Sequence, residues 1–231
     1  MQVLAIDTAT MQVGVAIGDG GSLRGEVRLA GGRRHAEELA PAIRQLVAWT
    51  GVRLDHLAAI AVGIGPGLFT GLRVGVTTAK VMAQALRIPV IPVVSLDLVA
   101  YPVRHSRRVI VAVLDARRRE VFHAAYRPVP GGVQRVTDYQ VGRPADLVAE
   151  LEAGGDEVLL VGDGVTAHAD VFAGLDRAEL AGPEFAAPST AALVALASAR
   201  YEQEEFSTPW EVEPLYLRES DAELGWEAVR G

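Results

Sequence analysis

The sequence has no cysteine and no long apolar run, and each absence excludes a class of protein. Without cysteine there is no disulfide bond and no thiolate metal site. No apolar stretch approaches the roughly 20 residues that a membrane-spanning helix needs. The first residues, Met1 to Asp7, lack the basic segment of a signal peptide and follow a strand-like pattern instead. We therefore expect an ordered cytoplasmic protein with no membrane contact, in which 231 residues form one large or two small domains.

Basic residues are scarce only at the C-terminus. Residues 1–201 contain 20 acidic and 20 basic residues, whereas residues 202–231 contain nine acidic and two basic ones. The last segment therefore accounts for the whole net charge of −7. This distribution does not favour direct nucleic-acid binding by the chain, and it is typical of an acidic tail that is solvated or contacts a basic partner.

Several catalytic signatures are also missing. No two of the five histidines are close enough in sequence to share a helical face, and Leu39 stands four residues after His35, where a zinc hydrolase has its second ligand. There is no Walker P-loop and no Gly-x-Ser-x-Gly nucleophile elbow. The sequence predicts no metal site, and we interpret His35 as a solvent-facing or interface residue.

The most informative segment runs from Val62 to Gly75, where an apolar run meets a glycine-rich turn and then a helical pattern. Small residues recur at every fourth position of this helix: Gly71, Gly75, Ala79 and Ala83. Side chains four apart lie on one helical face, and glycine costs about 1 kcal/mol in a helix relative to alanine. We therefore predict that this line is pressed against a partner helix, in the same chain or in another one. Anion binding at the helix N-terminus is the alternative use of the turn.

The chain contains a diverged duplication with a unit of about 105 residues, which is domain-sized. Residues 3–13 align with residues 111–121, so that Asp7 corresponds to Asp115, and Gly63-x-Gly65 parallels Gly162-Asp163-Gly164. Chance similarity of two hairpins remains the alternative.

Hydrophobic periodicity and turn residues predict an alternating α/β protein. Strands are predicted at 2–7, 12–18, 22–29, 58–63, 90–94, 109–115, 120–127 and 157–162. Helices are predicted at 35–49, 70–87, 95–101, 144–153, 166–173 and 189–203, with Thr70 as the N-cap of the second. A lobe boundary is expected between residues 101 and 108, and residues 207–218 are expected to be extended.

Three consecutive arginines, Arg117 to Arg119, occupy the predicted turn of the second hairpin. Such a turn is either a solvated loop or a contact for phosphate, including the backbone of tRNA. Both interpretations stay open from the sequence.

Six motifs of the sequence are Ile6 to Ala9, His35 to Glu37, Gly65 to Gly75, Asp115 to Arg117 with Glu120 to Phe122, Gly162 to Gly164, and Pro214 to Arg218. These motifs resemble the TsaB (YeaZ) family, the dimerisation subunit of the bacterial complex that makes threonylcarbamoyladenosine in tRNA. They run in order across nearly the whole chain. The Gly-Pro-Gly-x-Phe-Thr-Gly-Leu-Arg string is highly specific, and Leu68 departs from the serine common in the family.

The resemblance implies an actin-like ATPase (ASKHA) fold with two duplicated lobes, each a mixed β-sheet flanked by helices. It implies an N-terminal lobe at 1–104 that carries the partner-binding helices, a C-terminal lobe at 105–206, and an acidic tail at 207–231 that packs back on the lobes. The implied protein is not an enzyme. It is a scaffold for the TsaD-type catalytic subunit, which transfers threonylcarbamoyl to the adenosine next to the anticodon. A TsaE-type ATPase subunit is a further expected partner, tRNA is bound only through the complex, and the chain alone is expected to form a homodimer.

The partner interface is expected on the two long helices of the first lobe. The residues assigned to it are His35, Leu39, Ile43, Thr70, Gly71, Leu72, Gly75, Val76, Ala79 and Ala83.

Actin-like ATPases place a carboxylate facing Mg-phosphate where Asp7 ends the first strand; capping of the hairpin turn is the alternative role for this residue. A vestigial nucleotide site is accordingly assigned to Asp7, Thr8, Gly162, Asp163 and Gly164. No cofactor is expected to be required, although ATP or ADP with Mg at the heterodimer interface stays open. The competing functions are an actin-like Mg-ATP phosphotransferase and, more weakly, a metallo-glycoprotease.

Overall fold

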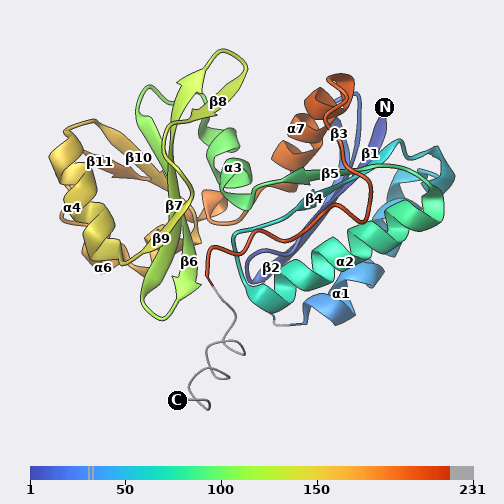
Figure 1. Ribbon diagram of the computed structural model, residues 1–231, viewed down its shortest axis with the longest axis horizontal. Helices are drawn as coiled ribbons and strands as arrows, with labels where there is room; N and C mark the ends of the chain where they lie inside the picture. The colour runs from blue at the N-terminus through green and yellow to red at the C-terminus, as the bar shows by residue number, and fades with distance from the viewer. Residues whose placement is uncertain (31, 33, 219–231) are drawn as a thin grey trace.

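The structure is a computed structural model, and it describes residues 1–30, 32 and 34–218. Two β-sheets lie side by side, and helices cover the faces of both (Figure 1). The strands are β1 (Gln2–Asp7), β2 (Gln12–Asp19), β3 (Ser22–Ala30), β4 (Ala59–Gly63), β5 (Val90–Val93), β6 (Val109–Arg117), β7 (Glu120–Val129), β8 (Gly132–Arg135), β9 (Gln140–Gly142), β10 (Val158–Val161) and β11 (Ala178–Leu180). The α-helices are α1 (His35–Thr50), α2 (Phe69–Leu86), α3 (Ser95–Ala100), α4 (Pro144–Gly154), α5 (Asp163–Ala167), α6 (Ala169–Phe172) and α7 (Thr190–Glu202).

The two sheets repeat the same topology. The first has the order β3-β2-β1-β4-β5, and the second has the order β8-β7-β6-β10-β11, with β9 paired to β7. In both, the central strand is antiparallel to the strand that follows it and parallel to the strand on its other side. This equivalence confirms the duplication predicted from the sequence.

Helices α1 and α2 cover one face of the first sheet. Their buried side chains, such as Leu39 and Val76, form one cluster with Leu4, Ile6 and Ile60 of the strands. The opposite face is covered by α7, whose Leu193 packs with residues of β1, β4 and β5. Consecutive strand residues point to opposite faces, so the almost wholly apolar β1 and β4 supply side chains to both clusters.

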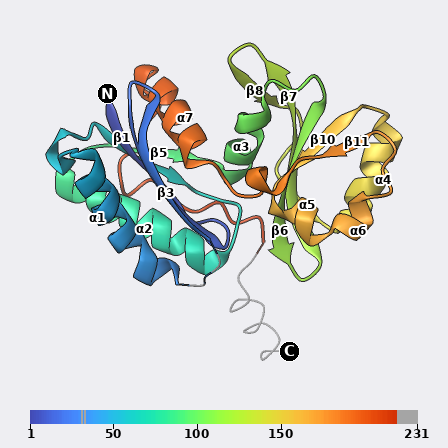
Figure 2. The same cartoon turned by 180° about the vertical axis from the view of Figure 1, so that it is seen from behind.

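The second sheet is covered by α4, α5 and α6 on one face and by α3 on the other. Helix α3 follows the strands of the first sheet in the chain but packs Leu96 and Val99 against β6 and β7. Helix α7 follows the second sheet but packs on the first, and Figure 2 shows both helices between the two sheets. The ranges 1–104 and 105–206 therefore describe repeats in the sequence and not units that pack only upon themselves.

Residues 207–218 run across both lobes without a helix; the segment is extended in part, as predicted, but it makes a turn at 209–211. Ser207 exchanges backbone hydrogen bonds with Val90, and the Leu215 N–H donates to the Ile64 carbonyl at 2.7 Å. Lys80 donates to the carbonyl of the buried Val212, and Arg218 forms a 2.9 Å ion pair with Glu120 on β7. The remainder of the predicted tail, residues 219–231, lies outside the described residues.

The structure corrects three details of the predicted elements. Strands β8, β9 and β11 were not predicted, because they have only three or four residues, none of them buried, and so lack an alternating apolar pattern. The helix predicted at 166–173 is two short helices, α5 and α6, which meet at His168. Thr70 is not an N-cap, because α2 begins at Phe69 and Leu68 occupies the cap position without a side-chain hydrogen bond.

Candidate partner-binding face and interlobe groove

The line of small residues on α2 faces the protein's own core. Gly71, Gly75, Ala79 and Ala83 are all buried in the single chain. A Cβ atom on Gly71 would overlap the Thr8 carbonyl oxygen, and one on Gly75 would overlap Thr8 Oγ1. Close approach of another segment is therefore the reason for the glycines, but that segment is the turn after β1, through the backbone of Thr8 at Gly71 and its side chain at Gly75. The prediction that this line contacts a second chain is wrong.

The other residues assigned to the interface are also buried within the single chain, with one exception. Leu39 and Ile43 of α1 and Leu72 and Val76 of α2 are buried against the first sheet. His35 is also buried, and its Nε2 donates to the Thr10 carbonyl at 2.8 Å, so the interpretation of His35 as a solvent-facing or interface residue is wrong. Thr70 alone among the ten residues is exposed.

The opposite faces of α1 and α2 form an outward surface that is rich in small side chains, which we call the outer helical face. Its residues are Ala36, Ala40, Pro41, Ala48 and Trp49 of α1 and Thr70, Arg73, Val74, Thr77, Thr78 and Val81 of α2. Two large apolar side chains stand out on it, since Trp49 is 71% exposed and Val81 is 60% exposed. Between Ala36 and the N-terminal half of α2 lies a shallow depression of about 480 Å³. Exposed apolar residues beside small ones are typical of a surface that another protein covers.

An aromatic and cationic cluster closes one end of the outer helical face. The Arg73 guanidinium lies 3.9 Å from the centre of the Phe69 ring, and its Nε donates to the Tyr216 hydroxyl at 3.3 Å. The Phe69 and Tyr216 rings are 5.1 Å apart. Arginine and tyrosine are enriched among the residues that dominate binding energy at interfaces. The cluster also joins α2 to residues 207–218. No local sequence pattern indicates this contact.

Asp7 is closed off by its own chain. It is only 3% exposed, its Oδ1 accepts from the Ala9 N–H at 3.1 Å, and its Oδ2 accepts from the Ser95 hydroxyl at 3.2 Å. A Cβ on Gly63 would overlap Oδ2, so the glycine is required beside the carboxyl group. Burial raises the pKa of Asp7 to about 7, although the two hydrogen bonds act in the opposite direction. This geometry matches the turn-capping alternative for Asp7.

The glycine-rich loop covers the turn that follows Asp7. The Leu68 N–H donates to the Ala9 carbonyl at 2.7 Å, and a Cβ on Gly67 would overlap the same carbonyl oxygen. Thr8 Oγ1 donates to the Gly71 carbonyl at 2.7 Å. The loop and the turn are in direct contact, and the Thr8 hydroxyl ties the turn to α2.

The Gly162-Asp163-Gly164 motif holds α5 against β6. Gly162 has φ +120°, and a Cβ there would overlap the Val113 carbonyl oxygen. Asp163 Oδ1 accepts from the Asp115 N–H at 2.9 Å, and burial raises the pKa of Asp163 to about 6. The structure thus joins Asp163 to Asp115, the residue that the duplication aligns with Asp7.

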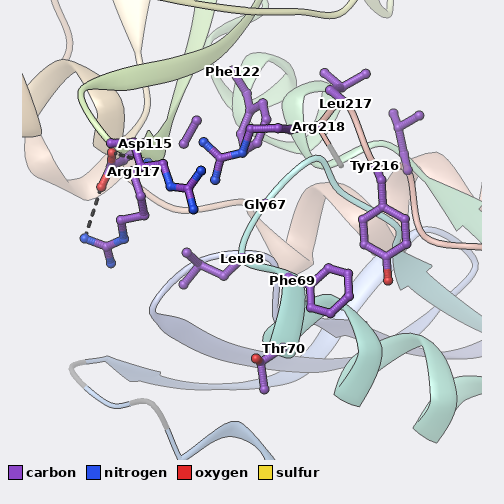
Figure 3. Close-up of a pocket in the computed structure, with 13 residues that line it drawn as sticks. Gly67, Leu68, Phe69, Thr70, Asp115, Arg117, Phe122, Tyr216, Leu217 and Arg218 are labelled. Atoms are coloured by element: carbon purple, nitrogen blue, oxygen red, sulfur yellow. Dashed lines mark hydrogen bonds and ion pairs between the residues drawn. The ribbon is translucent and has the colours of Figure 1, made fainter. Parts of the chain in front are cut away.

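A groove of about 430 Å³ lies between the two lobes, at the N-terminus of α2 (Figure 3). Leu68, Phe69 and Thr70 form one wall, and Asp115, Arg117 and Phe122 form the opposite wall. The lining residues are Gly67, Leu68, Phe69, Thr70, Asp115, Ala116, Arg117, Arg118, Phe122, Leu215, Tyr216, Leu217 and Arg218. Arginines outnumber acidic residues in this lining by three to one.

The arginine turn is the strained part of the groove. Arg117, Arg118 and Arg119 all have positive φ values, of 63°, 53° and 63°. The left-handed region costs a residue other than glycine about 1 kcal/mol or more, and such strain tends to cluster at functional sites. Arg117 pairs with Asp115 at 3.2 Å while its side chain remains 48% exposed.

Within residues 1–30, 32 and 34–218, no group of three histidine, cysteine, aspartate or glutamate side chains has a geometry that would hold a metal ion. A search of the same residues finds no helix that is long and apolar enough to cross a membrane.

Known proteins resemble the chain over its whole length. The family model described as "tRNA N6-adenosine threonylcarbamoyltransferase" matches residues 28–226. A protein of Haemophilus influenzae named "tRNA threonylcarbamoyladenosine biosynthesis protein TsaB" is 30% identical, over 100% of this chain and 98% of the relative. The protein of the same name from Escherichia coli is 28% identical, over 100% of this chain and 99% of the relative.

Solved structures agree with this result. YeaZ from Pseudomonas aeruginosa superposes with a TM-score of 0.80 at 28% identity, covering 94% of this chain and 99% of that chain. An activator of 2-hydroxyisocaproyl-CoA dehydratase from Clostridium difficile superposes with a TM-score of 0.51 at 13% identity, covering 94% of this chain and 100% of that chain, and it shows the fold alone. With its duplicated sheets and its actin-like ATPase fold, the chain belongs to the TsaB (YeaZ) family of tRNA threonylcarbamoyladenosine biosynthesis.

Proposed function

We propose that this protein is a non-catalytic scaffold subunit, which binds a TsaD-type catalytic subunit and holds it in a competent form. In this role it acts in the cytoplasm and supports threonylcarbamoyl transfer to the adenosine next to the anticodon without supplying a catalytic residue. It contacts tRNA only through the complex, to which a TsaE-type ATPase subunit also belongs.

The observation that carries the proposal is the outer helical face. Helices α1 and α2 lie side by side on one face of the first sheet, and many of their outward residues are small or apolar, although Glu37, Arg44 and Arg73 are also exposed there. Ala36, Ala40 and Ala48 lie on one line of α1, which the exposed Arg44 interrupts; the adjacent Ala36 and Ala40 allow another helix to approach closely near the N-terminus of α1. The two helices named in the prediction are retained, but the contacting residues are those on the side away from the sheet.

A charged substitution at the centre of this face tests the proposal. Thr77 is exposed on α2, so Thr77→Asp leaves the fold intact while it places a carboxylate in an interface without an assigned partner for it. We expect affinity for the catalytic subunit to fall at least about thirty-fold, measured by calorimetry, as for residues that dominate an interface. Gln134→Asp, on the exposed strand β8 of the other lobe, is the matched control. Equal affinity of Thr77→Asp and wild type would refute the proposed interface.

In the absence of the catalytic subunit, the same face is proposed to pair with its copy in a homodimer. Thr77→Asp is then expected to convert a dimer into a monomer in light scattering. Loss of heterodimerisation with an unchanged homodimer would separate the two uses of the face.

The second candidate is a Mg-ATP-dependent phosphotransferase, and the contacts of Asp7 and Thr8 argue against it. Their polar groups are engaged inside the chain. Titration of Mg-ATP into the isolated chain is expected to give no micromolar binding. Turnover that Asp7→Ala abolishes would instead support the phosphotransferase. ATP or ADP with Mg at the heterodimer interface is a separate proposal, tested by the same titration on the assembled complex.

The third candidate, a metallo-glycoprotease, has the weakest support, since the described residues offer no three-ligand metal geometry.

A further inference from the structure

The interlobe groove carries an inference that does not depend on the proposed scaffold function. We propose that the acidic C-terminal segment of this chain, residues 219–231, binds in the groove and shields its arginines from other anions. Residues 215–218 line the groove, the groove and the segment carry opposite charges, and both carry apolar residues.

The described chain ends inside the groove. Leu215, Tyr216, Leu217 and Arg218 are consecutive and all line it, and Arg218 is held in place by its ion pair with Glu120. Residue 219 is therefore covalently attached to a residue of the lining. Thirteen residues extend to at most about 45 Å, so the segment can reach any part of the groove. Attachment at this distance gives an effective concentration on the order of millimolar.

The charges of the segment and the groove are opposite. The segment contains Glu219, Asp221, Glu223 and Glu227 and a single base, Arg230. The groove presents Arg117, Arg118 and Arg218 and a single acid, Asp115. A guanidinium has five donors, so the pairing of Arg117 with Asp115 and of Arg218 with Glu120 leaves donors available for further carboxylates.

Apolar residues match as well. The groove has an apolar portion at Leu68, Phe122 and Leu217, and its volume of about 430 Å³ admits a few side chains. The segment carries Leu224 and Trp226 between its acidic residues. An outside phosphate would satisfy the arginines but not these apolar residues, which favours the chain's own segment as the occupant.

The absence of cysteine makes a direct test simple, because two introduced cysteines are the only labelling sites. Nitroxide labels at Thr70→Cys, in the groove wall, and at Ala222→Cys, in the segment, report their separation by double electron–electron resonance. In the full chain we expect a narrow distribution at short distance. Arg117→Gln/Arg118→Gln is expected to reduce this population roughly tenfold, as for two partly exposed ion pairs, and 1 M salt should act in the same direction. Arg44→Gln/Arg87→Gln removes the same charge from exposed sites on α1 and at the end of α2 and should have no effect.

A second measurement separates the segment from an outside anion. Binding of a labelled RNA oligonucleotide is compared for the full chain and for Glu219→Gln/Asp221→Asn/Glu223→Gln/Glu227→Gln. We expect the neutralised variant to bind about tenfold more tightly, and we expect Arg117→Gln/Arg118→Gln to remove that gain. A broad distance distribution that is unchanged by the arginine substitutions would overturn the proposal. Equally tight RNA binding by both chains would overturn it too, and would assign the groove to an outside polyanion.

Discussion

The two faces of α2 show why a stripe of small residues has two explanations. The inner face, with Gly71, Gly75, Ala79 and Ala83, is packed so tightly on the end of β1 that Thr8 contacts both glycine positions. The outer face, with Thr77 and Val81, is exposed. Small size on the inner face serves folding, whereas the small residues on the outer face are the ones we propose to contact another protein. Substitutions on the two faces should therefore have separable effects on stability and on binding.

The largest effect is expected on the inner face. Gly75→Leu forces a side chain into Thr8 and should lower the free energy of unfolding by about 4 kcal/mol or more, which is a large part of the stability of a typical domain. Urea denaturation measures this change. Ala85→Leu, at an exposed position of the same helix, should stay within about 0.5 kcal/mol of wild type. A fully stable Gly75→Leu protein would show that the inner face is not packed as described.

The next largest effect is a pH dependence of the free energy of unfolding that is caused by Asp7. This residue precedes Thr8, which contacts the inner face. Burial raises the pKa of Asp7 from 3.8 to about 7, so the folded state binds more protons than the unfolded state between these values. The contribution of Asp7 to the free energy of unfolding is therefore fully present below pH 4. It is lost as the pH rises towards 7, and the free energy of unfolding falls by on the order of 4 kcal/mol.

The check is to compare Asp7→Asn with wild type by urea denaturation from pH 4 to pH 8. Burial also raises the pKa values of Asp163 and Asp97, so the relevant quantity is the difference between the two proteins. That difference should favour wild type least at high pH. A difference that does not vary with pH would contradict the assignment.

A smaller effect is expected from the hydroxyl that links β1 to α2. Thr8→Val keeps the side-chain shape but removes the donor to the buried Gly71 carbonyl, which should cost about 1–3 kcal/mol. Thr77→Val, on the outer face of the same helix, is the matched control and should be nearly neutral in the isolated chain. Equal melting temperatures for Thr8→Val and Thr77→Val would argue against the importance of this bond.

The smallest effect on stability is expected at the edge of the outer face. Arg73→Ala removes a cation–π contact with Phe69 and a hydrogen bond to Tyr216, both near solvent, and should cost about 0.5–1 kcal/mol. The loss of binding free energy, measured by calorimetric titration with the catalytic subunit, should be larger than the loss of stability measured by thermal denaturation. A loss confined to stability would remove this cluster from the interface.

The fold was predictable because long apolar strands and helices carry strong periodic signals. The strands β1, β2, β4, β6 and β7 and the helices α1, α2, α4 and α7 all appear close to their predicted ranges. The duplication was visible in the matched strand ends at Asp7 and Asp115. Strand β11 was missed because its three residues are partly or fully exposed.

The site was predicted less well, for a physical reason. Periodicity identifies which residues share a face of α2, but a sheet and a partner helix require the same small residues on that face. Only the three-dimensional position of Thr8 distinguishes the two. The groove could not be predicted for a similar reason, since Phe69, Arg117 and Arg218 are far apart in the sequence and no local pattern brings them together.

The most direct test of the account is the protection of the outer helical face by the catalytic subunit. Because the chain has no cysteine, Thr77→Cys is the only thiol, and its alkylation rate can be followed with and without the partner. We expect saturating catalytic subunit to slow alkylation at least about tenfold, while Gln134→Cys on the other lobe reacts at an unchanged rate. An unchanged rate at Thr77→Cys in a complex that demonstrably forms would contradict it.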